Sequence, residues 1–200
     1  MHNKFLIVIA IVFSAAVTAF SASALAQNQT SPLPVSTANM TLDAAKDTYL
    51  SVWNQTEFNA TFSTFVQPFS ASGYGVYDER GSIFEPGETM VLYVEPVGYD
   101  FMQVLDNRGN TLYVMNMTAD YTIADADGNE LAMIKDVPVG SIASHRQNTE
   151  LFLELSLTQA SPFPEGDYLI TYVVTDEVSG ESFELEKQVT IAKTSTSTVA

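Results

Sequence analysis

Residues 164–191 read PEGDYLITYVVTDEVSGESFELEKQVTI, and this segment is the clearest indication of a fold class. Apolar and polar side chains alternate on both sides of Val178-Ser179-Gly180-Glu181, and a period of two is the pattern of a half-buried strand. The four residues between the two runs supply turn chemistry, because Gly and Ser readily adopt tight-turn conformations. The segment therefore predicts an antiparallel hairpin with strands at 167–176 and 182–191.

Segments of the same kind recur from Gly73 onward. Runs rich in Val, Ile, Tyr, Phe and Thr are separated by turns such as 106–110 and 125–129, whose Asp, Asn and Gly residues tolerate left-handed backbone. A long loop is expected at 135–148. Short strands at this spacing are typical of two stacked antiparallel sheets, so the predicted fold is mainly β, an antiparallel β-sandwich. Further strands are expected at 74–78, 89–95, 99–105, 111–124, 130–134 and 149–158.

A short N-terminal helical extension is expected before the sandwich. Leu42, Ala45, Tyr49 and Val52 recur at helical spacing, which predicts a helix over 42–53. Residues 58–66 fit helical spacing and strand alternation, and their β-branched and aromatic content favours a strand. The expected organisation is a signal peptide at 1–26, a flexible linker at 27–41, an N-terminal extension at 42–72, a β-sandwich domain at 73–192 and a disordered Thr/Ser tail at 193–200.

The N-terminus is typical of an export signal. Lys4 precedes an apolar run from Phe5 to about Val17, and Ala24-Leu25-Ala26 supplies the small residues that signal peptidase reads. The run is shorter than the roughly 20 apolar residues of a membrane span. We therefore expect cleavage before Gln27 and an extracytoplasmic protein that is secreted, periplasmic or held at the cell surface. The alternative is an uncleaved membrane anchor.

The composition excludes several classes of protein. There is no Cys among the 200 residues, which excludes disulfides and a lipid-modified cysteine, so stability must come from a buried core. The net charge of −16 becomes −17 when residues 1–26 are removed with their one Lys and no acid. This charge excludes a basic nucleic-acid footprint and would be repelled by an anionic membrane surface. No stable membrane span is expected after signal cleavage.

Asn-x-Ser/Thr sequons mark candidate N-glycosylation sites. Four of them fall within residues 28–61, and this density together with export favours glycosylation in an organism that has the machinery. The sequon at Asn116 lies inside a predicted strand, where the asparagine side chain can be buried. The candidates are Asn28, Asn39, Asn54, Asn59 and Asn116.

Short motifs stand out between residues 73 and 191. They are Gly73–Tyr77, Arg80–Ser82, Phe84–Glu88, Tyr93–Gly98 and Ser144–Arg146, followed by the final hairpin from Pro164. Together they resemble a family of exported bacterial and archaeal proteins with an immunoglobulin-like β-sandwich domain. The resemblance implies this fold and an extracytoplasmic location, and it implies no activity.

Side chains suited to catalysis are sparse. His145 is the only histidine after residue 26, and there is no G-x-S-x-G nucleophile motif, so we expect no catalytic residues and no enzyme. Asp125 and Asp127 invite a calcium reading, but an EF-hand loop needs Gly and Glu where this chain has Glu130 and Asp136. We expect no cofactor and a plain hairpin turn here. A looser calcium site at Asp125 and Asp127 is the alternative.

Tyrosines form the candidate ligand-binding group: Tyr74, Tyr77, Tyr93 and Tyr99. Tyrosines exposed on a rigid sheet can stack on sugar rings or dock a protein, and the competing interpretation is that they fill the core. The leading functional hypothesis is a non-enzymatic cell-surface or secreted binding or structural module, whose partner is a protein or glycan at the cell surface. The alternative is a carbohydrate-binding accessory module that uses surface tyrosines, with calcium.

Overall fold

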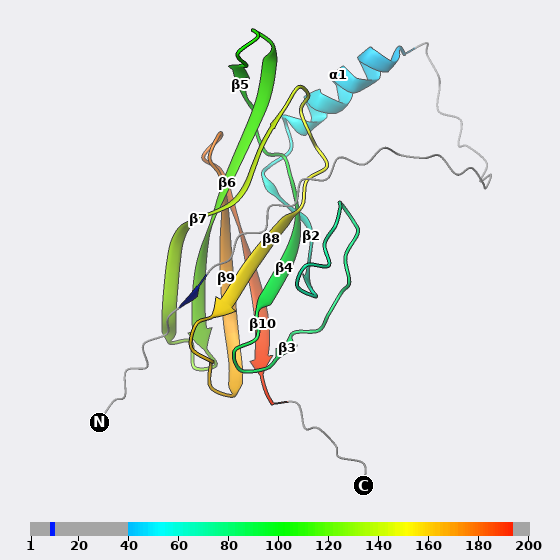
Figure 1. The fold of residues 1–200 in the computed structure, drawn as a ribbon. Helices are drawn as coiled ribbons and strands as arrows, with labels where there is room; N and C mark the ends of the chain where they lie inside the picture. The colour runs from blue at the N-terminus through cyan, green and yellow to red at the C-terminus, as the bar shows by residue number, and fades with distance from the viewer. Residues whose placement is uncertain (1–8, 11–39, 194–200) are drawn as a thin grey trace, which may run out of the picture.

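The computed structural model describes residues 9–10 and 40–193, which form two β-sheets and one helix (Figure 1). The predicted mainly β, antiparallel fold is confirmed, and the two layers accord with a sandwich. The expected signal peptide apart from 9–10, the expected linker up to residue 39, and the expected tail from residue 194 lie outside the described residues.

The first sheet has the strand order β1-β8-β4-β2, and its neighbours all pair antiparallel. Its strands are β1 (Ile9–Ala10), β8 (Leu153–Gln159), β4 (Met90–Val97) and β2 (Asn59–Val66).

The second sheet has the order β3-β10-β9-β6-β5, and a further strand, β7, also pairs with β6. Its pairings are antiparallel except that of β3 with β10, which is parallel. The predicted final hairpin is present as β9 and β10. The strands are β3 (Ile83–Phe84), β10 (Ser182–Ile191), β9 (Gly166–Asp176), β6 (Thr111–Asp125), β5 (Met102–Leu105) and β7 (Glu130–Ser144).

The main core lies between the sheets and is built by alternation along the strands. On β9, the buried side chains are Tyr168, Ile170, Tyr172 and Val174, and the residues between them are part-exposed. The strand ends on Asp176, which is fully buried. Its carboxylate accepts hydrogen bonds from the backbone amide of Asp100 at 2.9 Å, the amide of Val178 and the hydroxyl of Ser179. Asp176 therefore ties the β9–β10 turn to the link between β4 and β5.

Helix α1 (Leu42–Trp53) agrees with the predicted helix and projects from one end of the sandwich (Figure 1). Thr41 caps it, because its hydroxyl accepts a hydrogen bond from the Ala44 amide. Trp53 is the one buried residue of the helix, and its indole N–H donates to the carbonyl oxygen of Tyr99 at 2.9 Å. No helix in the described part of the chain has the length and apolar character of a bilayer span.

The sandwich begins earlier in the chain than expected. Strand β2 pairs with β4 over most of its length, so the expected boundary at residue 73 is wrong and the expected extension at 42–72 contains a sandwich strand. The alternation in 58–66 favoured this strand, but its place in the sheet depends on a partner about thirty residues later, which local spacing does not reveal.

Two other expected elements are also wrong. No strand forms at 74–78, because residues 73–76 make a tight turn in which Gly75 has a φ of 70° and the Val76 amide donates to the Gly73 carbonyl. The expected loop at 135–148 is mostly strand, because β7 continues to Ser144. Asp136, with a φ of 54°, lies where the β6–β7 register shifts, and a bulge of this kind hid the strand from a search for regular alternation.

Candidate functional site

The outer face of the first sheet, which points away from the main core, carries a second aromatic group. The ring of Tyr93 on β4 lies at its centre, with its centroid 4.4 Å from Tyr77, 5.3 Å from Phe152 and 6.4 Å from Phe62. Tyr93 belongs to a small apolar cluster that is separate from the main core. The sheet therefore has a packed aromatic layer on both sides.

The loop at 67–80 folds over this layer and is fixed by hydrogen bonds. The Gly75 amide donates to the Tyr93 hydroxyl at 2.8 Å, and that hydroxyl donates to the Glu95 carboxylate, also at 2.8 Å. At the base of the loop, the Gln67 amide donates to the Asp78 carbonyl. The loop thus presents Tyr74 and Tyr77 to the sheet on a defined backbone.

We call Phe62, Tyr74, Tyr77, Tyr93 and Phe152 the aromatic face. Tyr93 is fully buried, whereas Phe62 is 39% and Tyr74 is 45% exposed. The rings of Phe62 and Tyr77 stack at 5.9 Å with an interplanar angle of 23°. Tyr93 is therefore the buried support of this face, and Phe62 and Tyr74 are its accessible contact groups.

Four carboxylates lie near the aromatic face, and we call them the acidic rim: Glu79, Glu95, Glu150 and Glu154. Strand register places Glu95 opposite Phe62 and Glu154 opposite Tyr93. Glu79 accepts a hydrogen bond from the hydroxyl of Thr64 at 2.9 Å.

The tyrosines of the aromatic face respond to burial and to the negative potential of the rim. Burial first, and then Glu95, raises the pKa of the Tyr74 hydroxyl, with a smaller contribution from Glu150. Burial, Glu95 and Glu79 raise the pKa of the Tyr77 hydroxyl. Burial also raises the pKa of the Glu154 carboxyl. The contributions of Glu95, Glu79 and Glu150 show that the rim carboxylates favour positive charge at this face and disfavour negative charge.

Of the four candidate tyrosines, three come together and one does not. Tyr74, Tyr77 and Tyr93 belong to the aromatic face. Tyr99 is fully buried in the main core, edge-on to Trp53 at 5.0 Å, and its hydroxyl donates to the Asn148 carbonyl. Gly98, at a φ of 76°, turns the chain between the two groups.

Sequence reasoning missed the other members of this site. Phe62 lies on a strand whose partner was unknown. Glu154 lies on β8 and Phe152 directly precedes it, far away in the chain. One signal was available, since alternation places Phe62 and Val66 on one face of a strand. Strand pairing was needed to join them to β4 and β8.

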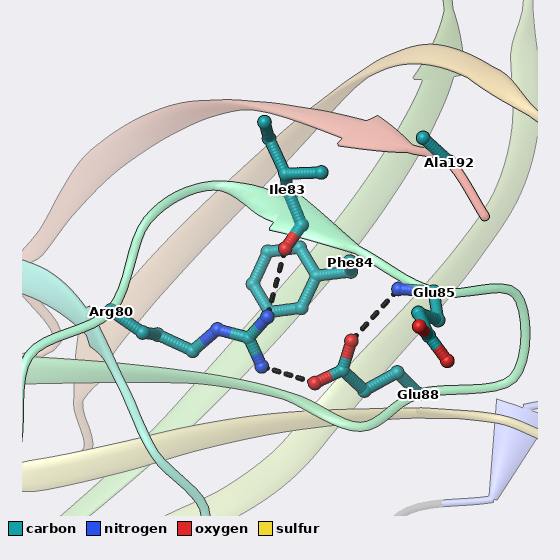
Figure 2. A pocket seen from close by; sticks show the side chains of 6 residues that line it. All are labelled: Arg80, Ile83, Phe84, Glu85, Glu88 and Ala192. Atoms are coloured by element: carbon teal, nitrogen blue, oxygen red, sulfur yellow. Dashed lines mark hydrogen bonds and ion pairs between the residues drawn. The ribbon is translucent and has the colours of Figure 1, made fainter. Parts of the chain in front are cut away.

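The pocket drawn in Figure 2 lies at the other end of the same loop and has a volume of about 410 Å³. Arg80 forms an ion pair with Glu88, and its guanidinium lies 4.0 Å from the ring centroid of Phe84. It also donates to the Ile83 carbonyl at 2.8 Å, while Glu88 accepts from the Glu85 amide at 2.8 Å (Figure 2).

These contacts make the Arg80 pocket a structural tie between the loop, strand β3 and the turn at 85–88. Burial by itself raises the pKa of the Glu88 carboxyl, but the hydrogen bonds from Arg80 and the Glu85 amide outweigh it and lower the pKa. Arg80 and Glu88 therefore neutralise each other's charge within the pocket.

The two aspartates considered for calcium lie in the β6–β7 turn. The carboxylate of Asp125 accepts hydrogen bonds from the amides of Asp127 and Asn129 and from the Asn129 side chain. These contacts account for Asp125 as a turn residue. Among residues 9–10 and 40–193, no group of three or more His, Asp or Glu side chains is arranged to hold a metal ion. Calcium binding here stays a prediction.

Three sequons are described, and all three asparagines are exposed. Asn54 is the C-cap of α1, Asn59 begins β2 and Asn116 lies on β6. Asn116 is exposed although it lies in a strand, because its neighbours Met115 and Met117 are the residues that point inward. Asn28 and Asn39 lie outside the described residues. Whether any of the five carries a glycan stays a prediction.

His145 is exposed and follows the last residue of β7. Its position at the edge of the second sheet does not bring it into the aromatic face or the Arg80 pocket.

Comparison with known proteins adds no family to this description. No protein-family model matches the chain, and no curated protein matches it in sequence.

Proposed function

We propose that this protein is a non-enzymatic binding module that acts outside the cytoplasm, and that the aromatic face is its binding surface. The observation that carries the proposal is that two exposed aromatic side chains, Phe62 and Tyr74, lie over a rigid support, the buried and hydrogen-bonded Tyr93. Surface aromatic groups held on a sheet bind partners at low conformational cost, because few side-chain rotations are lost.

An immunoglobulin-like topology is part of this proposal, and the strand order supports it. One layer has β8, β4 and β2, and the other has β10, β9, β6 and β7 as neighbours. These orders correspond to the E-B-A and G-F-C-C′ layers of immunoglobulin-like sandwiches. Tyr168 adds a second similarity, because its hydroxyl bonds back to Pro164 at the corner before β9. Domains of this architecture often bind through an exposed surface.

Export is also part of the proposal, and it rests on the N-terminal sequence. Mass spectrometry of the native protein should give a mature chain that starts at Gln27. An intact Met1 would contradict export by signal cleavage.

The absence of catalysis is tested at His145, since an imidazole is the side chain whose unperturbed pKa lies closest to neutrality. We expect His145→Ala to leave ligand binding unchanged. A general acid or base typically contributes about 10²–10⁴-fold to a rate. A hundredfold loss of any turnover in this variant, at unchanged thermal stability, would replace the binding module with an enzyme.

A second candidate function is a carbohydrate-binding accessory module. The near-parallel stacking of Phe62 and Tyr77 favours it, because flat aromatic platforms beside hydrogen-bond acceptors suit sugar rings. In this alternative the acidic rim accepts hydrogen bonds from sugar hydroxyls.

The binding function is tested with the labelled secreted protein on its native cell surface. We expect the double variant Phe62→Ala, Tyr74→Ala to lose most of the bound signal. The matched control is Tyr49→Ala, since Tyr49 is also 50% exposed but lies on α1. Equal binding by wild type and the double variant would show that the aromatic face is not the binding surface.

A further inference from the structure

We propose that the aromatic face and the acidic rim bind a basic segment of a partner protein, with a Lys or Arg side chain seated against Phe62 and Tyr74. This inference rests on the proposed binding function and names the chemistry of the partner. Three observations support this inference. The rim carboxylates have no cationic partner in the described part of the chain, the rings of Phe62 and Tyr74 are accessible, and the acids are spread over neighbouring strands.

The carboxylates of the rim have no cationic partner in the described part of the chain. The ion pairs there are Arg80–Glu88, Lys135–Asp120 and Lys193–Glu165, and none includes a rim residue. Glu154 is part-buried opposite Tyr93, so its negative charge is held where solvation is weaker than in open water. A partner cation would compensate this charge.

The rings suit the same kind of ligand. An ammonium or guanidinium group over an aromatic ring is stabilised by the ring quadrupole by about 0.5–2 kcal/mol. The chain already makes one such contact within itself, where Arg80 lies 4.0 Å from the centroid of Phe84. Phe62 and Tyr74 offer the equivalent contact to a partner.

The spread of the acids indicates a peptide segment rather than a single small cation. Glu95 lies on β4, Glu154 lies on β8, and Glu79 lies beside β2, where it bridges to Val66. Neighbouring strands lie about 4.8 Å apart, and three such spacings separate β8 from the segment of Glu79, so the rim spans about 14 Å. An extended segment with two or more basic residues can satisfy carboxylates on all three elements at once.

A neutral sugar would use only part of this surface. It would stack on the rings, but it would leave the charge of the rim uncompensated. A basic segment uses both the rings and the carboxylates, so charge complementarity favours it over a glycan.

The test measures binding of a labelled Gly/Ser peptide with three spaced Arg residues, compared with the same peptide carrying Gln in their place. We expect the Arg peptide to bind and the Gln peptide not to bind. Phe62→Ala with Tyr74→Ala should weaken the Arg peptide by about tenfold, the change that about 1.4 kcal/mol produces. Glu154→Gln should weaken it several-fold. Phe62→Leu keeps the apolar volume and removes the ring, so it covers the case in which the alanine variants fold poorly.

Non-specific attraction to an acidic protein is controlled by Glu184→Gln with Glu186→Gln, which removes two exposed charges on β10. This control should leave binding nearly unchanged. Weakening by the control as large as that by Glu154→Gln would overturn the inference, since total charge would then explain the binding.

Binding of a neutral oligosaccharide, cellohexaose, distinguishes failure of this inference from failure of the proposed binding function. Binding of cellohexaose at Phe62 and Tyr74 without binding of the Arg peptide overturns the basic-segment inference and leaves the binding module intact. Failure of both probes also overturns the inference. The binding module itself fails only if, in addition, the native cell surface does not distinguish wild type from the double variant.

Discussion

The hydroxyl of Tyr168 donates a hydrogen bond to the carbonyl oxygen of Pro164, which lies 2.9 Å away and four residues earlier in the chain. The ring of Tyr168 is 7% exposed and lies 5.4 Å from that of Phe163. One side chain thus closes the end of the core and fixes the corner that leads into β9.

We expect Tyr168→Ala to lower the free energy of unfolding by about 3 kcal/mol or more, the range for removing a large buried side chain. Tyr168→Phe keeps the ring and removes only the hydrogen bond, so it should cost about 1 kcal/mol. Urea denaturation measures both values. A loss below about 0.5 kcal/mol for the alanine variant would contradict the role assigned to the ring.

Replacement of Tyr172 by Phe should have the opposite effect on stability to replacement of Tyr168 by Phe. The hydroxyl of Tyr172 is buried and has no hydrogen-bond partner among the described residues. A buried polar group without a partner costs about 1–3 kcal/mol, so Tyr172→Phe should leave stability unchanged or raise it by about 1 kcal/mol. Thermal and urea unfolding should be compared with Tyr168→Phe, which removes a bonded hydroxyl. Destabilisation by both variants to the same extent would show that Tyr172 has a partner.

Gly98 should tolerate no side chain. Its φ is 76°, and an added Cβ would lie 2.4 Å from the Thr56 carbonyl oxygen and 2.6 Å from that of Glu57. We expect Gly98→Ala to destabilise by about 3 kcal/mol or more, through left-handed strain and a backbone clash together. Gly109 is the matched control, because its φ is 79° and nothing lies within 4 Å of its added Cβ. Gly109→Ala should cost about 1 kcal/mol. Similar losses for the two variants would rule out the clash.

Glu154 should make the folded protein less stable as pH rises. Burial raises the pKa of its carboxyl above 4.5, so the folded state holds this proton more tightly than the unfolded state. Stability from this group is therefore present below the unfolded pKa and is lost as pH rises through the folded pKa.

Glu154→Gln should accordingly match wild type in acid and exceed it at neutral pH. The gain should be below about 1 kcal/mol, because solvent screens a half-exposed group. Urea midpoints measured across pH 3 to 8 give the comparison, with Glu184→Gln as an exposed control. A gain that is already present at pH 3 would have another cause.

The sequence predicted best where a structure is set by neighbouring residues. Helix α1 and the β9–β10 hairpin agree with their patterns, because spacing and turn chemistry determine both locally. The bulged part of β7 and the turn at Gly75 were missed, since both interrupt regular alternation. The buried role of Asp176 was not visible either, because one of its donors, Asp100, lies 76 residues away in the chain.

The candidate site was predictable only in part for the same reason. Three of the four candidate tyrosines lie together on the outer face, and Tyr99 lies apart from them, since it faces the main core. Phe152 and Glu154 reach the site through the pairing of β4 with β8, a relation between distant segments. Local patterns do not determine such pairings.

The parallel pairing of β3 with β10 also constrains when the protein can fold. Ile83 pairs with Thr190, so the chain between them must be complete before the second sheet can reach its edge. The strand β10 supplies Phe183, Val189 and Ile191 to the core. A chain that is synthesised from its N-terminus therefore lacks a complete core until this last strand is available. We therefore expect the chain to stay open until β10 has been synthesised. An open chain is what the proposed export would need for passage through a narrow translocation channel, and folding would then follow passage of the final strand.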